Sequence, residues 1–155
     1  GTTAIGIAIG AGAALGVGAA WLAGRAGDRF GSFPVALVGG VGLGVMPLIL
    51  ILPLPTWGIL AVLVAIGPFF PILMTGVFPL MTHAADDLGL SHGTGTALAN
   101  MVWSGGFAVT PLVVAPIAEA AGDPVAYAVA GAAVAVLLAI AVIMRSRARN
   151  LSLSH

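Results

Sequence analysis

The sequence predicts an all-α protein, a polytopic bundle of five transmembrane helices. Only 6% of the 155 residues are charged and 60% are hydrophobic, whereas a soluble globular domain carries about 25% charged residues. Such a chain has too few polar side chains to cover a surface in water, so lipid is the expected solvent. Its apolar runs are long enough to cross about 30 Å of hydrocarbon as helices. The runs cover residues 3–23, 34–54, 57–82, 93–120 and 125–144 of a single transmembrane domain, 1–155, with a tail at 145–155.

The first run is rich in glycine. Gly6 and Gly10 are four residues apart, as are Gly12 and Gly16. This spacing places small residues on one face of a helix, and in a membrane such a face lets a second helix approach closely. We therefore expect a helix that packs through its glycines.

A polar stretch, residues 24–31, separates the first run from the second. Arg25, Asp28 and Arg29 lie within five positions of one another between two apolar runs. A charge cluster in this place predicts a tight loop at a membrane surface. Pro34 opens the second run, as is typical of the first turn of a helix.

The third run follows a short turn at residues 53–56 and contains Pro68, Pro71 and Pro79. Each proline removes a backbone donor and disfavours a straight helix. We expect a kinked or locally unwound span, whose prolines act either as hinges or as kinks that accommodate neighbouring helices.

Several side chains within the third and fourth runs are candidates for lining a substrate cavity. The candidates of the third run lie on or beside one helix face, which continues to Phe78. Packing in the core or against lipid is the alternative role of this face. The asparagine and serine of the fourth run share a helix face, and hydrogen bonding to a neighbouring helix is their alternative role. The candidates are Phe70, Met74, Thr75, Asn100 and Ser104.

A second polar stretch, residues 83–92, is predicted to be a solvated loop. The spacing of His83, Asp86 and Asp87 matches no standard metal site. Ser91 or Thr94 is expected to cap the helix of the fourth run.

The arginines predict the orientation. Because five spans alternate sides, both polar stretches and the tail share one side, and all five arginines fall there. Basic residues favour the cytoplasmic side. We expect a multi-pass protein of the cell membrane with a cytoplasmic C-terminus.

Several chemistries are not predicted. The chain has no cysteine and places no nucleophile beside a base and an orienting group. It has no phosphate-binding loop and no basic patch with interleaved aromatic residues for nucleic acid. We therefore predict no catalytic residue, no metal, no cofactor and no enzyme activity.

The pattern Gly24-x-x-x-Asp28-Arg29-x-Gly31 resembles the signature loop of the major facilitator superfamily. In that family the loop links the second and third helices and recurs, more weakly, between the eighth and ninth. The two closing basic positions of the family are Ser32 here and the phenylalanine after it, and the third run lacks the intramembrane arginine of the family's fourth helix. Both departures favour the second copy. The five runs thus resemble helices eight to twelve, a partial six-helix bundle at the C-terminal end of such a transporter.

The resemblance implies membrane transport of a small solute by alternating access in a secondary transporter, with drug or metabolite efflux as one form. Gly24, Asp28, Arg29 and Gly31 would form a conformational-switch loop, with Asp28 meeting a helix of the opposite bundle; the alternative is a solvated loop pair. The implied partners are the lipid bilayer, the N-terminal helices of the same transporter, which this chain lacks, and a small-molecule substrate.

Two other functions compete with transport. The first is a non-transporting, glycine-packed membrane scaffold or subunit. The second is a membrane-embedded enzyme that uses His83 with Asp86 and Asp87 at the interface.

Overall fold

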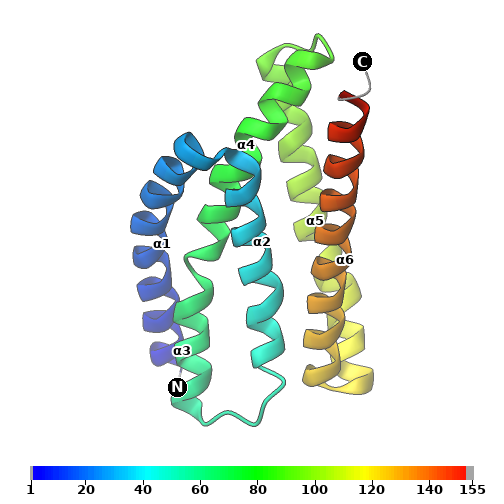
Figure 1. Cartoon of the computed structure of the whole chain (residues 1–155). Helices are drawn as coiled ribbons and strands as arrows, with labels where there is room; N and C mark the ends of the chain where they lie inside the picture. The colour runs from blue at the N-terminus through cyan, green and yellow to red at the C-terminus, as the bar shows by residue number, and fades with distance from the viewer. Residues whose placement is uncertain (1, 153–155) are drawn as a thin grey trace.

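A computed structural model describes residues 2–152, with the side chains of all these residues except 92, 107, 148, 149, 151 and 152 (Figure 1). Residues 153–155, the end of the predicted tail, lie outside the described part. Five helical segments are long and apolar enough to cross a membrane, because α3 and α4 together form one of them. This result confirms the predicted all-α bundle. The helices are α1 (Thr2–Phe30), α2 (Ser32–Ile49), α3 (Thr56–Ile66), α4 (Phe69–Asp87), α5 (His92–Ala121) and α6 (Asp123–Ser152).

Successive spans run in opposite directions. The start of α1 and the α2–α3 and α5–α6 connections lie at one end of the bundle, and the α1–α2 and α4–α5 connections lie at the other (Figure 1). The end of α6 lies at this second end of the bundle as well. The second end therefore carries Arg25 and Arg29 of α1 and Arg145 and Arg147 of α6. We call it the arginine end.

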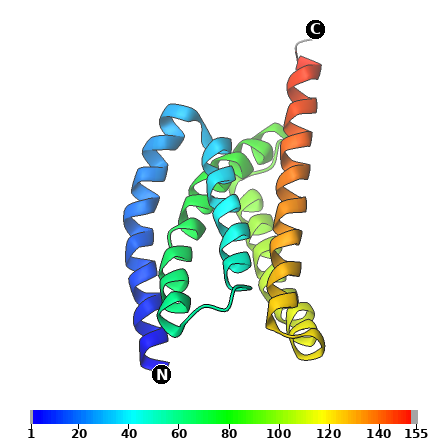
Figure 2. The same ribbon diagram turned by 60° about the horizontal axis from the view of Figure 1, so that its bottom comes forward.

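Helix α2 is the centre of the bundle and contacts α1, α3, α4 and α6 (Figures 1 and 2). The glycines of α2 permit the close approach of these helices. A Cβ atom on Gly39 would lie 2.5 Å from the Cα atom of Leu73 in α4, and one on Gly40 would lie 2.7 Å from a methyl carbon of Leu138 in α6. Carbon atoms in contact are normally about 3.5–4.0 Å apart. A side chain at Gly39 would therefore push α4 away, whereas one at Gly40 would first displace the end of the Leu138 side chain.

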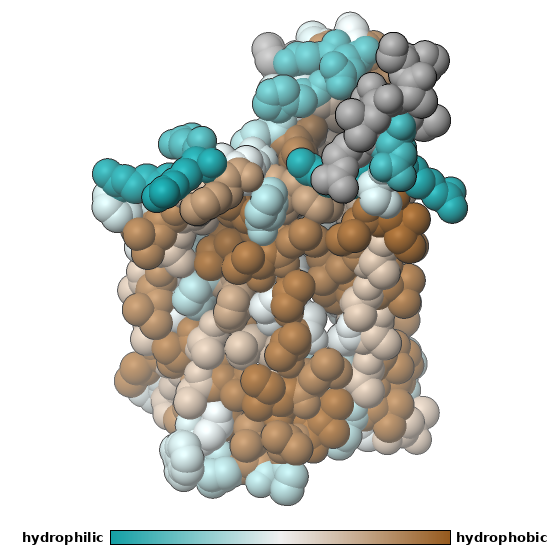
Figure 3. All heavy atoms as spheres, in the orientation of Figure 1, coloured by the Kyte–Doolittle hydropathy of each residue, from teal (hydrophilic) through white to brown (hydrophobic). Residues whose placement is uncertain are grey.

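The interior consists of small residues, and the large apolar side chains face outward. Val17 is 75% exposed and Leu112 is 74% exposed. Figure 3 shows the outward side chains as a hydrophobic band, with hydrophilic groups gathered at the two ends. In water an apolar surface of this extent would be an interaction or aggregation site, so the band indicates contact with lipid. The buried apolar residues are Ala8, Ala23, Val35, Ala36, Val62, Ala85, Ala99 and Ala126.

Two of the connections between helices are single glycines. Gly31 (φ 89°, ψ 160°) joins α1 to α2, and Gly122 (φ 87°, ψ 159°) joins α5 to α6. This backbone conformation is essentially restricted to glycine.

The predicted loops at 24–31 and 83–92 are too long. Residues 24–30 are the last turns of α1, residues 83–87 end α4, and residues 145–152 of the predicted tail continue α6. A helix satisfies its own backbone hydrogen bonds, so it can continue past the membrane surface. The polar residues mark where the apolar band ends and do not mark where the helix ends.

Helix α4 extends beyond the start of α2 at the arginine end. Gly76 packs against the backbone of Ser32 and Ala36 in the first turns of α2. Residues 77–87 continue from there for about 16 Å at 1.5 Å per residue, and the α4–α5 connection stands above the rest of the bundle (Figure 1). The connection ends at Ser91, whose hydroxyl accepts a hydrogen bond from the Thr94 amide at 3.2 Å and caps α5 as predicted.

Candidate functional site at a broken span

The third span is interrupted between α3 and α4. The Gly67 amide donates to the carbonyl oxygen of Val64, three residues back, at 3.3 Å, and the Ile72 amide donates to the carbonyl oxygen of Pro68 at 3.2 Å. Pro68 and Pro71 have no N–H, so the carbonyl groups of Val64 and Gly67 lack the donors that a continuous helix would supply. Gly67 (φ −52°, ψ −45°) and Pro68 (φ −63°, ψ −32°) nevertheless keep helical backbone angles. The prolines therefore interrupt the hydrogen bonding of this span, as predicted, without unwinding its backbone.

Helix α1 packs against this break through two of its glycines. A Cβ atom on Gly12 would lie 3.0 Å from the Val64 carbonyl oxygen, and one on Gly16 would lie 3.3 Å from the Gly67 carbonyl oxygen. By contrast, a Cβ atom on Gly6 or Gly10 would meet nothing within 4 Å in the described structure. The predicted packing face is therefore confirmed for Gly12 and Gly16, and for Gly6 and Gly10 it stays a prediction.

An apolar groove of about 590 Å³ runs along this contact between α1 and α3–α4. The groove is open along one side, where Val17 on its wall is 75% exposed, and its volume is comparable with the roughly 300–1,000 Å³ of small-molecule sites. Gly67 is among the lining residues, and no charged residue lines the groove within the described chain. The arrangement suits an uncharged, largely apolar molecule. The lining residues are Ile9, Ala13, Gly16, Val17, Ala20, Leu63, Ile66, Gly67, Phe70 and Pro71.

Of the predicted cavity residues of the third run, Phe70 lines this groove. Its ring also contacts Trp103 of α5, with ring centroids 4.9 Å apart and planes inclined by 41°. Met74 and Thr75 are half-buried and are not among the groove residues. The Thr75 hydroxyl donates to the Pro71 carbonyl oxygen at 2.8 Å, a bond within its own helix.

The two predicted cavity residues of α5 lie apart from the groove. Asn100 and Ser104 are exposed. Neither side chain makes a hydrogen bond within residues 2–152. A polar group in a membrane is usually satisfied by a neighbouring helix or by water in a cavity. We therefore expect this face of α5 to be covered by another helix or by a water-filled space.

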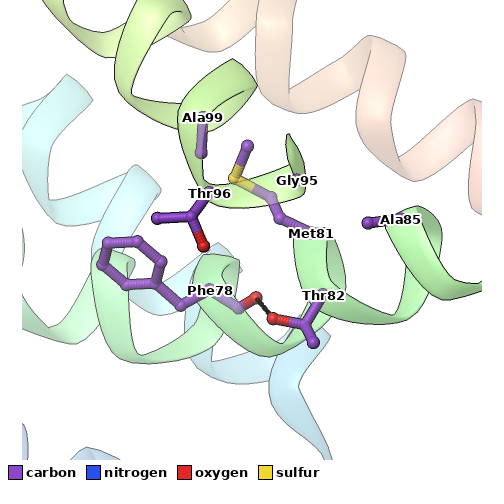
Figure 4. A pocket seen from close by; sticks show the side chains of 7 residues that line it. All are labelled: Phe78, Met81, Thr82, Ala85, Gly95, Thr96 and Ala99. Carbon is purple, nitrogen blue, oxygen red and sulfur yellow. Dashed lines mark hydrogen bonds between the residues drawn. The ribbon is translucent and has the colours of Figure 1, made fainter. Parts of the chain in front are cut away.

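A second, smaller pocket lies between α4 and α5 (Figure 4). Its volume is about 40 Å³, enough for a water molecule. The Thr82 hydroxyl beside it donates to the Phe78 carbonyl oxygen at 3.1 Å. The pocket belongs to the part of α4 that extends past α2, so it lies at the arginine end. The lining residues are Phe78, Met81, Thr82 and Ala85 of α4 and Gly95, Thr96 and Ala99 of α5.

The four predicted switch residues lie together at the α1–α2 junction. Gly31 is the break between the helices, and its positive φ explains why glycine stands there. Asp28 and Arg29 are exposed and form no ion pair within the described part of the chain. A Cβ atom on Gly24 would meet nothing within 4 Å, so no contact here requires glycine at that position.

The fold and its composition define a helical bundle consistent with an integral membrane protein. Comparison with known proteins found no matching family model, no matching curated protein and no matching solved structure.

Proposed function

We propose that this chain is part of a secondary transporter of the major facilitator type, which moves a small solute across the cell membrane by alternating access. The observation that carries the proposal is the interruption of helical hydrogen bonding at Gly67 and Pro68 beside a 590 Å³ groove. Transporters commonly place their substrate sites at discontinuous helices, where backbone groups are free to bind. The composition of the groove favours an uncharged, mostly apolar solute such as a drug-like molecule or a hydrophobic metabolite.

The α1–α2 junction supports the same proposal. Asp28 projects from the arginine end with no partner in the described chain, as expected for a carboxylate that meets a helix supplied by the rest of the transporter. We place the arginine end, and with it the end of α6, on the cytoplasmic side, because basic residues favour that side.

A groove-filling substitution tests the transport role. Ala13 lines the groove, and its neighbour Ala14 is exposed on α1 but is not a groove residue. In proteoliposomes of the full-length protein, screened with a panel of radiolabelled uncharged solutes, Ala13→Phe should reduce uptake at least tenfold. Ala14→Phe, the matched control, should retain uptake within twofold. Equal activity of both variants would contradict the assignment of the groove, and absence of uptake of any solute by the wild type would contradict transport.

A non-transporting membrane subunit is a second candidate, favoured by the open glycines of α1. Gly6 and Gly10 leave a face that another helix can approach closely. A subunit that assembles with copies of itself would be a stable oligomer in detergent, as measured by light scattering after size-exclusion chromatography. A monomer would count against this candidate.

A further inference from the structure

Three arginine side chains at the arginine end stack on aromatic rings. The guanidinium carbon of Arg25 lies 3.6 Å from the ring centroid of Trp21, and that of Arg29 lies 5.3 Å from the ring centroid of Phe30. Both pairs are within α1. The third pair, Arg145 over Phe33, joins α6 to α2.

Arg145 of α6 lies over Phe33 of α2, with 4.1 Å between the guanidinium carbon and the ring centroid. Phe33 is half-buried in the first turn of α2, two residues after the break at Gly31. The ring therefore gives Arg145 a fixed support. Arg147, two residues further along α6, has no such ring contact in the described structure.

These cations have no internal counter-ions. None of Arg25, Arg29, Arg145 and Arg147 forms an ion pair with a carboxylate within residues 2–152. Asp28 lies beside Arg25 and Arg29, and Asp86 and Asp87 end α4 at the same end of the bundle, so the four arginines exceed the three carboxylates by one charge. A ring covers one face of a stacked guanidinium and leaves its N–H edge free to donate two parallel hydrogen bonds to a phosphate.

The position of these pairs identifies the source of the phosphate. Hydrophilic side chains project outward from the edge of the hydrophobic band at the arginine end (Figure 3). The rings of Trp21 and Phe30 beside them are 62% and 65% exposed. Aromatic rings at the edge of an apolar band lie at the level of lipid headgroups, and arginines there attract anionic lipids.

We propose that these three arginine–aromatic pairs bind the headgroups of anionic phospholipids, and that Arg145 over Phe33 is the best-ordered site among them. This role goes beyond the proposed transport and does not depend on it. The occupant is a membrane lipid and not a soluble phosphate, because the acyl chains would lie along the apolar band directly below the headgroup.

Native mass spectrometry of the detergent-solubilised full chain tests the proposal, with phosphatidylglycerol and phosphatidylcholine as probes. We expect tighter binding of phosphatidylglycerol. Arg145→Gln should weaken that binding about fivefold, as expected for one arginine at a membrane surface. Arg147→Gln, which removes the same charge from the same helix, should weaken it less than twofold. Arg145→Lys keeps the charge but loses the planar stacked group, so its affinity should fall between those of Arg145→Gln and the wild type.

Three results would overturn the proposal. Equal losses in Arg145→Gln and Arg147→Gln would show diffuse attraction in place of a site. Equal affinity for both lipids would exclude recognition of an anionic headgroup. Displacement of phosphatidylglycerol by excess inorganic phosphate would assign the arginines to a soluble anion. Circular dichroism of each variant checks that the helices are intact.

Discussion

Replacing Gly39 by alanine should loosen the contact between α2 and α4. The new methyl carbon would lie 2.5 Å from the Cα atom and 2.8 Å from the Cβ atom of Leu73. Because carbon atoms in contact are about 3.5–4.0 Å apart, the two helices must separate by roughly 1 Å. The obstructing atoms belong to the backbone of α4 and its first side-chain carbon, so no rotamer change can relieve the clash.

The expected magnitude follows from two opposing terms. Overpacking of a close contact costs about 1–3 kcal/mol, and the backbone obstruction places Gly39 at the upper end. Alanine regains up to about 1 kcal/mol through its higher helix propensity. The net loss should be about 2 kcal/mol in the free energy of unfolding. Gly10→Ala is the matched control, because its methyl group would meet nothing within 4 Å in the described structure. It should be neutral or stabilise by up to about 1 kcal/mol.

The measurement is reversible unfolding of the full chain in mixed micelles, with increasing dodecyl sulfate and helix content followed by circular dichroism. Gly39→Ala should unfold at a lower dodecyl sulfate fraction than the wild type, and Gly10→Ala at an equal or higher one. If Gly39→Ala were as stable as the wild type, the close approach of α2 and α4 would be refuted. If Gly10→Ala were as damaging as Gly39→Ala, the open face of α1 would be refuted.

Three further predictions concern the arginine end. Gly31→Ala should lower the free energy of unfolding by about 2 kcal/mol in the same assay, because alanine is strained at φ 89° and ψ 160°. Gly27→Ala is the control, because its methyl group would meet nothing within 4 Å in the described structure; equal stability of the two variants would contradict this reason. Asp28→Asn should reduce uptake by the full-length protein without reducing its insertion, and wild-type uptake would exclude the switch role. Ser146→Cys, at an exposed position of α6, should react with a membrane-impermeant maleimide from the cytoplasmic side only, and labelling from outside would reverse the orientation.

The spans and the broken helix could be predicted because their causes are local. Apolar runs of membrane length report on the solvent around each helix, and Pro68 and Pro71 remove N–H groups whatever their surroundings. The capping role of Ser91 is local in the same way. The ends of the helices at the arginine end could not be predicted. Polar residues such as Arg25 or His83 show where the lipid ends, but a helix can continue into water beyond that point without penalty.

The groove was only partly predictable because it is a tertiary feature. Phe70 was a candidate on account of its spacing, but the α1 wall of the groove consists of ordinary apolar residues such as Ile9 and Val17, which carry no signal in the sequence. The four-residue spacing of Gly12 and Gly16 was the available signal. It indicated that α1 approaches another helix closely, but it did not identify the break at Gly67 as the place of contact.

The glycine contacts separate a fixed part of the bundle from a part that remains open. All four glycines in the middle of α2 face α4 or α6, so α4 and α6 each pack closely on α2. The backbone of α1 at Gly12 packs as closely on Gly67, between α3 and α4. Helices α1 and α5 also carry glycines that meet nothing within 4 Å in the described structure, and α5 carries Asn100 and Ser104, whose side chains make no hydrogen bond there. In the proposed transporter, further helices would therefore approach the open faces of α1 and α5. Asp28 stands at the end of α1, where a helix that covers its open face would also meet the carboxylate. The open glycines concerned are Gly6, Gly10, Gly18 and Gly24 on α1 and Gly105 and Gly106 on α5.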